Sequence, residues 1–288
     1  MARSSADPAL YALIESLNPA VKIADCQISP VSGLTGESWR ITAPSIDWLA
    51  REQSVQKTQL GVNRRRERKL LRHVAGSDLS PAIIAANSHW LVVNWLTGDV
   101  VTNSQFIELA NNGQLASLLA RLHHLPASGY RLDLRAQLIR YGVLIDPARR
   151  SAGWLRLQQD FLRRPQPQPV KLTPLHMDIH PGNLLMTAAG LKLIDWEYAA
   201  DGDIALDIAA LFRGNGWSMP QQQAFLQRYC NSEHGYPDIR RLSRQIQRWL
   251  PWIDYLMLMW FEVRWQQTGD SAFLQWAAPL RQRFNLSF

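Results

Sequence analysis

The 288-residue sequence has little cysteine, and its two cysteines, Cys26 and Cys230, are far apart and form no C-x-x-C motif. It lacks an apolar run of the roughly 18 residues needed to span a bilayer. The best candidate, 249–261, is short and interrupted by Pro251 and Asp254. The N-terminal residues lack the apolar core of a secretion signal. We therefore expect a cytoplasmic protein in a reducing compartment, with no membrane partner.

Acidic residues are outnumbered, since 31 basic against 24 acidic residues give a net charge of +7. Hydrophobic residues make up 47% of the chain, which is ample for a folded core. The densest basic cluster, 64–69, is typical of a solvated helix face rather than a nucleic-acid patch. A site for a triphosphate accounts for the excess charge. We expect no nucleic-acid partner.

A catalytic pattern lies in the second half of the chain. Asn183 follows Asp178 after four intervening residues, and Asp195 follows a short apolar segment. This order matches the kinase set H-x-D-x-x-x-x-N plus the Asp of D-F-G. We expect Asp178 to take the proton of an acceptor hydroxyl, and Asn183 and Asp195 to hold Mg²⁺ through oxygen. The segments 184–187 and 191–194 are expected to form a hairpin that brings Asn183 and Asp195 to one end, which favours a kinase over a chance polar turn.

The first third of the chain is predicted to hold strands at 23–31, 37–43 and 47–52. A turn rich in small residues precedes the second strand, and glycine there allows backbone N–H groups to approach phosphates. Its predicted phosphate-binding residues are Gly33, Thr35, Gly36 and Ser38. A hairpin turn without a ligand is the alternative.

The third strand carries Arg51 where kinases normally place a lysine. Arginine also binds phosphate, although its geometry differs from that of lysine. The segment 62–75 is expected to be helical and contains Glu67, the predicted partner of Arg51. Exposed surface side chains are the alternative for both residues.

A pair of strands is expected at 81–86 and 89–95, followed by a hinge near Gly98. Backbone groups at such a hinge can bind the edge of adenine. The predicted residues are Val93, Asn94 and Trp95. The alternative is a buried strand with no role in nucleotide binding. The strand itself does not distinguish the two, because a nucleotide site at the hinge also needs it.

The rest of the chain is predicted to be mainly helical. The expected helices are 104–125, 147–163, 204–213, 219–232, 238–249 and 252–268. We thus predict two lobes: residues 1–96, with the phosphate loop and hinge, and residues 97–288, with the catalytic loop, the metal site and the acceptor pocket.

Three segments resemble signatures of the aminoglycoside phosphotransferase and choline kinase family. They are H-M-D-I-H-P-G-N at 176–183, D-W-E-Y-A at 195–199 and G-D-I-A-L-D-I-A at 202–209. The resemblance implies an α+β, protein-kinase-like fold, with a small β-rich N-lobe and a larger, mostly helical C-lobe. It also implies structural roles for His176 and for Asp207, which would brace the catalytic loop.

Further segments narrow the resemblance to the bacterial subgroup that phosphorylates thiamine. They lie at 33–38, 153–156 and 260–270, so the resemblance covers nearly the whole chain. It implies transfer of the ATP γ-phosphate to the thiamine hydroxyl, giving thiamine monophosphate in a salvage route. Glu197 stands where protein kinases carry glycine, which argues against a protein kinase.

Tryptophan is abundant, with 12 residues, and four lie close together near the C-terminus. Aromatic faces attract poorly hydrated cations such as a thiazolium, by about 0.5–2 kcal/mol each. The predicted acceptor-binding residues are Glu197, Trp249, Trp252, Trp260, Glu262 and Trp265. Burial in the core is the alternative for any one of the tryptophans.

The sequence thus predicts a kinase that uses ATP as co-substrate and Mg²⁺ as cofactor and acts on thiamine. Alternatives are a choline or amino-alcohol kinase and an aminoglycoside phosphotransferase. The few carboxylates between 240 and 288 weigh against the latter, because aminoglycosides carry several ammonium groups. A nucleotide-binding regulator without activity is the non-enzyme alternative, which the intact catalytic set disfavours. We expect no obligate protein partner.

Overall fold

The computed structural model describes residues 8–19, 23–31 and 38–286. The helices are α1 (Pro8–Leu17), α2 (Val55–Gln59), α3 (Arg64–Val74), α4 (Asn103–Asn111), α5 (Gln114–His124), α6 (Leu134–Leu144), α7 (Ala152–Arg163), α8 (Ile204–Gly214), α9 (Met219–Asn231), α10 (Ile239–Thr268) and α11 (Ala272–Arg283). The strands are β1 (Gln27–Pro30), β2 (Ser38–Ala43), β3 (Ile46–Glu52), β4 (Ile83–Ala86), β5 (Trp90–Asn94), β6 (Asp99–Val100), β7 (Leu172–Leu175), β8 (Leu184–Thr187), β9 (Gly190–Leu193) and β10 (Ala200–Asp203). Short 3-10 turns include η3 (Pro147–Arg149), η4 (Pro181–Asn183) and η5 (Trp196–Tyr198).

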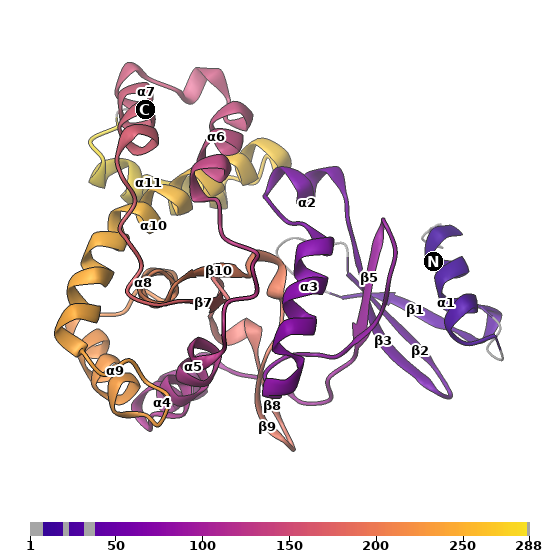
Figure 1. Ribbon diagram of the computed structural model, residues 1–288. Coiled ribbons are helices and arrows are strands. Elements are labelled where there is room, and N and C mark those ends of the chain that lie inside the picture. Colours follow the sequence, from indigo (N-terminus) through magenta and orange to yellow (C-terminus); the bar gives the residue numbers. More distant parts are fainter. Residues whose placement is uncertain (1–7, 20–22, 32–37, 287–288) are drawn as a thin grey trace.

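The N-terminal part is an antiparallel sheet in the order β1-β2-β3-β5-β4. Alternate residues of its strands face opposite sides. Ala50 and Val92 pack with Leu10 and Ile14 of α1 in a small apolar cluster. Their neighbours along the strands face α3, which lies between the sheet and the helical part (Figure 1). Arg51 is thereby directed toward the space between the two parts.

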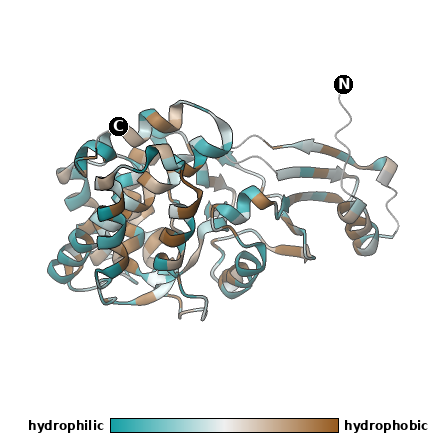
Figure 2. Cartoon of the chain, turned by 90° about the horizontal axis from the view of Figure 1, so that it is seen from above, coloured by the Kyte–Doolittle hydropathy of each residue, from teal (hydrophilic) through white to brown (hydrophobic). Residues whose placement is uncertain are grey.

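The C-terminal part is mostly helical and holds the larger core. Figure 2 shows the sheet extending away from the group of helices, so the two lobes are distinct in outline. The C-terminal part also contains two small antiparallel ladders: β10 with β7, and β6-β8-β9. The hairpin predicted at 184–187 and 191–194 is confirmed as β8 and β9.

Several helix predictions need correction. The expected helix 104–125 is divided at Gly113, whose positive φ of 89° ends the first helix and starts the second. The two helices expected around Pro251 are one continuous helix, α10. Proline removes one backbone hydrogen bond of a helix. The buried flanking side chains of Leu250 and Trp252 compensate for that loss by packing in the core. Helices α2, α6 and α11 were not predicted.

Within the described ranges, no helix is long and apolar enough to cross a bilayer.

Candidate active site

The catalytic loop follows β7 and is fixed at its start by Asp207 of α8. The carboxylate of Asp207 accepts hydrogen bonds from the backbone N–H groups of His176 at 3.1 Å and Met177 at 2.7 Å. It also lies 3.1 Å from Nε2 of His123, on α5. Burial disfavours the charged carboxylate, but His123, His176 and the N–H of Met177 together outweigh it and lower the pKa of Asp207. Asp207 therefore makes the bracing contacts that the sequence resemblance implied, and His123 was not predicted.

His176 ties the loop to the strand that precedes Asp195. Its side chain is fully buried, and Nε2 lies 2.9 Å from the backbone oxygen of Ile194. A carbonyl can only accept, so Nε2 carries the proton. Burial lowers the pKa of His176 and keeps the ring neutral. Met177, the next residue, has a positive φ of 67°, an unusual conformation for a residue with a side chain. The chain therefore turns sharply at Met177, directly before Asp178.

Asp178 and Asn183 form the centre of the loop. Nδ2 of Asn183 donates to the backbone oxygen and to Oδ2 of Asp178, both at 2.9 Å. Burial, then the charges of Asp195 and Glu197, raise the pKa of Asp178 to about 7, although the hydrogen bond from Asn183 opposes this shift. A carboxylate with a pKa in this range is suited to exchange protons near neutral pH.

Asp195 lies next to Asn183 because the backbone N–H of Ile194 donates to the backbone oxygen of Asn183 at 3.0 Å. Asp195 adopts a positive φ of 61° at the start of η5. Its carboxylate forms an ion pair with Arg51. Burial disfavours the carboxylate charge, but Arg51, with the nearby charges of Lys57 and Arg64, outweighs it and lowers the pKa of Asp195 to about 2. Asp195 is therefore ionised, as a metal ligand must be.

The predicted pair between Arg51 and Glu67 is formed. Nη1 of Arg51 lies 2.8 Å from Oε1 of Glu67, and both side chains are buried. Ser38, the last residue of the predicted phosphate loop, sits opposite Arg51 in the β2–β3 ladder. The sheet register thus places the end of that loop beside the cation.

Two buried cations of this region were not predicted from the sequence. Lys57 of α2 contacts both carboxylate oxygens of Glu197, at 2.8 and 3.2 Å. Arg64, at the start of α3, lies 2.6 Å from Glu67 and 3.2 Å from Glu197. Burial lowers the pKa of Lys57, whereas the carboxylate of Glu197 opposes this shift. The sequence places Arg64 in a basic run that resembles a solvated face, so it gave no signal of this burial.

Glu197 does not lie as predicted. It was expected to attract a cationic acceptor, but its carboxylate is buried and contacts Arg51, Lys57 and Arg64 of the N-lobe. Its charge is thus already balanced, although Arg51 and Arg64 also pair with other carboxylates. The structure thus favours a role in joining the two lobes.

The structure describes only some of the other residues predicted to bind the nucleotide. Gly33, Thr35 and Gly36 lie outside the described residues. Val93 is buried in β5 and packs in the main core.

Asn94 and Trp95 end the strand at the predicted hinge. The side chain of Asn94 accepts a hydrogen bond from the N–H of Ala82 at 2.6 Å. The backbone N–H of Trp95 donates to Asp47, and the guanidinium of Arg40 lies 4.2 Å from the centre of the Trp95 ring. The hinge is thus held to the sheet by side chains as well as by its backbone.

The four tryptophans predicted to bind the acceptor do not lie together around one site. Trp249 and Trp252 are core residues: Nε1 of Trp249 donates to Asp203 at 2.8 Å, and Trp252 packs edge-on against Phe161. They are buried because their face of α10 points into the main core.

The other predicted acceptor residues of α10 lie nearer its C-terminal end. Glu262 is buried in ion pairs with Arg149 and Arg281, and is therefore not available to a cationic acceptor. The same Arg149 lies over the ring of Trp265, at 5.0 Å. Trp260 is partly exposed, and its Nε1 donates to the hydroxyl of Tyr198 at 3.0 Å. Tyr198 follows Glu197 directly, so Trp260 contacts the turn that begins at Asp195.

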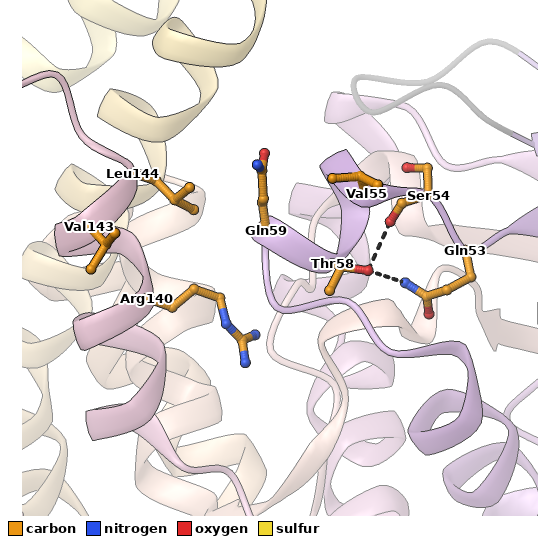
Figure 3. A pocket seen from close by; sticks show the side chains of 8 residues that line it. All are labelled: Gln53, Ser54, Val55, Thr58, Gln59, Arg140, Val143 and Leu144. Carbon is orange, nitrogen blue, oxygen red and sulfur yellow. Dashed lines mark hydrogen bonds between the residues drawn. The ribbon is translucent and has the colours of Figure 1, made fainter.

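A groove of about 530 Å³ lies between α2 and α6 (Figure 3). Arg140, Val143 and Leu144 of α6 face it from one side. The opposite side is formed by Gln53, Ser54, Val55, Thr58 and Gln59. Among the residues that the structure describes, no predicted site residue lines this groove, and the buried Lys57 of the same helix points to Glu197 instead.

The chain resembles known proteins in sequence and in structure. It is 43% identical over 212 residues to a thiamine kinase of Escherichia coli O157:H7, covering 72% of this chain and 74% of that relative. A thiamine kinase of Shigella dysenteriae serotype 1 is 42% identical over the same shares. The structure is similar to a choline kinase of Streptococcus pneumoniae, with a TM-score of 0.75 at 16% identity and coverage of 96% and 98% of the two chains. It is also similar to an ethanolamine kinase of Plasmodium vivax, with a TM-score of 0.72 at 16% identity and coverage of 96% and 87%.

These neighbours confirm the predicted protein-kinase-like, two-lobed α+β fold. Residues 28–243 match the phosphotransferase enzyme family. This range contains both the N-terminal sheet and the catalytic loop. The chain belongs to the phosphotransferase enzyme family.

Proposed function

We propose that the protein transfers the γ-phosphoryl group of ATP to the hydroxyl of thiamine, giving thiamine monophosphate and ADP. The observation that carries the proposal is the placement of Asp178, Asn183 and Asp195 at one end of a hairpin, in a chain 43% identical to thiamine kinases. Residues 1–96 would hold most of the nucleotide, and residues 97–288 the acceptor and the metal.

The carboxylate of Asp178 orients the acceptor hydroxyl and takes its proton. The hydroxyl oxygen forms a bond to the γ-phosphorus, while the bond from that phosphorus to the β,γ-bridging oxygen breaks. The electron pair of the broken bond stays with ADP. The pKa of about 7 suits Asp178 to this exchange near neutral pH.

The donor set fits Mg²⁺. With Nδ2 of Asn183 bonded to Asp178, its Oδ1 remains for a cation, and Asp195 supplies an ionised carboxylate. Among the described residues there is no cluster of three or more His, Cys, Asp or Glu that would hold a metal without a substrate. Mg²⁺ commonly binds through one or two protein side chains plus substrate phosphates. When bound, it would neutralise charge on the phosphates during transfer.

The nucleotide would lie between the sheet and the catalytic loop. Arg51, held by Glu67, faces this space and would contact phosphate. We assign the phosphates to Gly33, Thr35, Gly36 and Ser38, and the base to the backbone around Val93, Asn94 and Trp95.

For the acceptor, we retain Trp260 of the four predicted tryptophans and add Tyr198. Burial, followed by the nearby charge of Glu197, raises the pKa of Tyr198, so its hydroxyl stays protonated. That hydroxyl accepts from Trp260 and can still donate. The partly exposed ring of Trp260 would offer an aromatic face to the thiazolium cation.

The decisive experiment measures ATP-dependent ADP release with thiamine, choline, ethanolamine, kanamycin and glucose, and identifies the product by mass. Thiamine should give the highest kcat/KM, and the Asp178→Asn variant serves as the negative control. A higher kcat/KM with choline or ethanolamine would assign the protein to the amino-alcohol kinases. ATP binding without turnover of any acceptor would support a nucleotide-binding regulator instead.

A further inference from the structure

A group of charges, buried except for the partly exposed Asp195, joins the two lobes beside the catalytic loop. Its members come from β3, α2 and α3 on one side (Figure 1), and from Asp195 and η5 on the other. Their charges balance, with three cations and three carboxylates. We call it the Glu197 cluster: Arg51, Lys57, Arg64, Glu67, Asp195 and Glu197.

Arg51 is shared among the three carboxylates of the Glu197 cluster. Nη1 contacts Glu67 at 2.8 Å, whereas Nη2 contacts both Asp195 and Glu197, the latter at 3.0 Å. For Arg51 to reach a phosphate, and for Asp195 to bind a metal, the contact between these two residues must break. The released Nη2 group then either turns to the nucleotide or stays with Glu197.

The outcome depends on how well the charge of Glu197 is balanced by other groups. Lys57 is 1% exposed, and its Nζ lies 2.8 and 3.2 Å from the two oxygens of Glu197. It is nearer to this carboxylate than Arg51 or Arg64, whose closest distances to Glu197 are 3.0 and 3.2 Å. A buried carboxylate that loses its main partner attracts the remaining cations strongly.

We propose that Lys57 is a positioning residue for nucleotide binding: it neutralises Glu197, and thereby leaves Arg51 free to move from Asp195 to the phosphates of ATP. This inference rests on the proposed function for its ligand, ATP, but not on the identity of the acceptor. Without the Lys57 ammonium, Glu197 holds Arg51, and the cluster carries one excess negative charge that repels the anionic nucleotide.

Titration calorimetry with ATP, with and without Mg²⁺ and in the absence of any acceptor, tests this role. Lys57→Met should weaken ATP binding by about tenfold or more, equal to about 1.4 kcal/mol. Lys57→Arg keeps the charge and should bind ATP within about threefold of the wild type. Steady-state kinetics should show a larger effect on the KM for ATP than on kcat.

The double variant Lys57→Met/Glu197→Gln separates charge balance from simple loss of a buried contact. It removes one charge of each sign, so ATP affinity should return to within about threefold of the wild type. Val55→Ala is the matched control on α2, because Val55 is 75% exposed and lies on the groove side of the helix. It should leave ATP affinity unchanged. Thermal unfolding of each variant shows whether a change in ATP affinity comes with a loss of stability.

Two results would overturn the inference. One is a folded Lys57→Met protein with wild-type ATP affinity and only a lower melting temperature. The other is a double variant that is folded yet binds ATP as weakly as Lys57→Met. If Lys57→Met does not fold, the ATP affinities of Lys57→Arg and of the double variant test the inference. Both should lie within about threefold of the wild type, and a folded variant outside that range would contradict it. If the wild-type protein binds ATP but does not phosphorylate thiamine, only the assignment of thiamine as acceptor is wrong. If it does not bind ATP, both proposals are wrong.

Discussion

The side-chain amide of Asn183 lies 2.9 Å from both the backbone oxygen and the carboxylate Oδ2 of Asp178. This double contact orients the carboxylate and, at the same time, turns the amide oxygen of Asn183 away from it. One side chain thus links the proposed base to the proposed metal site. The amide nitrogen serves one of these functions and the amide oxygen the other.

We expect Asp178→Asn to lower kcat by about 10²–10⁴-fold, because a positioned base is lost. ATP affinity should be equal to or slightly better than that of the wild type, since a nearby negative charge is removed. Turnover and ATP titration on the same preparation measure both effects. A variant with near-wild-type kcat would exclude Asp178 from the chemistry.

The two proposed metal ligands should differ in the size of their effect. In Asp195→Ala, added Mg²⁺ should no longer improve ATP binding, because the ionised ligand is gone. Asn183→Ala should keep a weaker response to Mg²⁺, since a neutral amide contributes less to binding a cation. Mg²⁺ titrations at fixed ATP measure the difference. Equal defects that do not depend on metal would contradict the assignment.

The pH dependence of activity should follow the raised pKa of Asp178, about 7. The base works in its ionised form, so kcat/KM for thiamine should rise between about pH 6 and pH 8 and then level off. A pH profile at several thiamine concentrations measures this. A profile that is flat across this range would show that ionisation of Asp178 does not limit the reaction.

The same pKa has a consequence for stability. Because the folded pKa of Asp178 lies above its unfolded value, the folded state binds more protons between about pH 4 and pH 7, and stability falls as pH rises through this window. Asp178→Asn should therefore raise the melting temperature more at pH 8 than at pH 5. Thermal unfolding of both proteins at the two pH values gives the comparison. An equal shift at both pH values would mean that the ionisation of Asp178 is not involved.

Two tryptophans of α10 should respond differently to replacement by leucine. Trp249→Leu removes a buried ring and its bond to Asp203, so it should lower stability by about 1–3 kcal/mol. Trp260→Leu should instead raise the KM for thiamine several-fold, as expected for the loss of about 1 kcal/mol of cation–π attraction. Thermal unfolding and KM measurements for both substrates compare the two variants. If Trp260→Leu only loses stability, its role is structural.

The sequence by itself determined the catalytic hairpin. Asp178, Asn183 and Asp195 lie within one short stretch, where a hairpin fixes which residues meet. The pair between Arg51 and Glu67 was also predictable, because a strand and the helix that follows it are neighbours in this fold. In these places, spacing along the chain limits the possible geometry.

Only the tertiary structure decided the contacts between distant segments. Lys57 and Glu197 are 140 residues apart, and no local pattern marks them as partners. The tryptophans of α10 likewise share a spacing that suits either a binding face or a core face, and packing buried Trp249 while leaving Trp260 partly exposed. Periodicity shows which side chains share a face of a helix, but what that face meets depends on how the other elements pack around it.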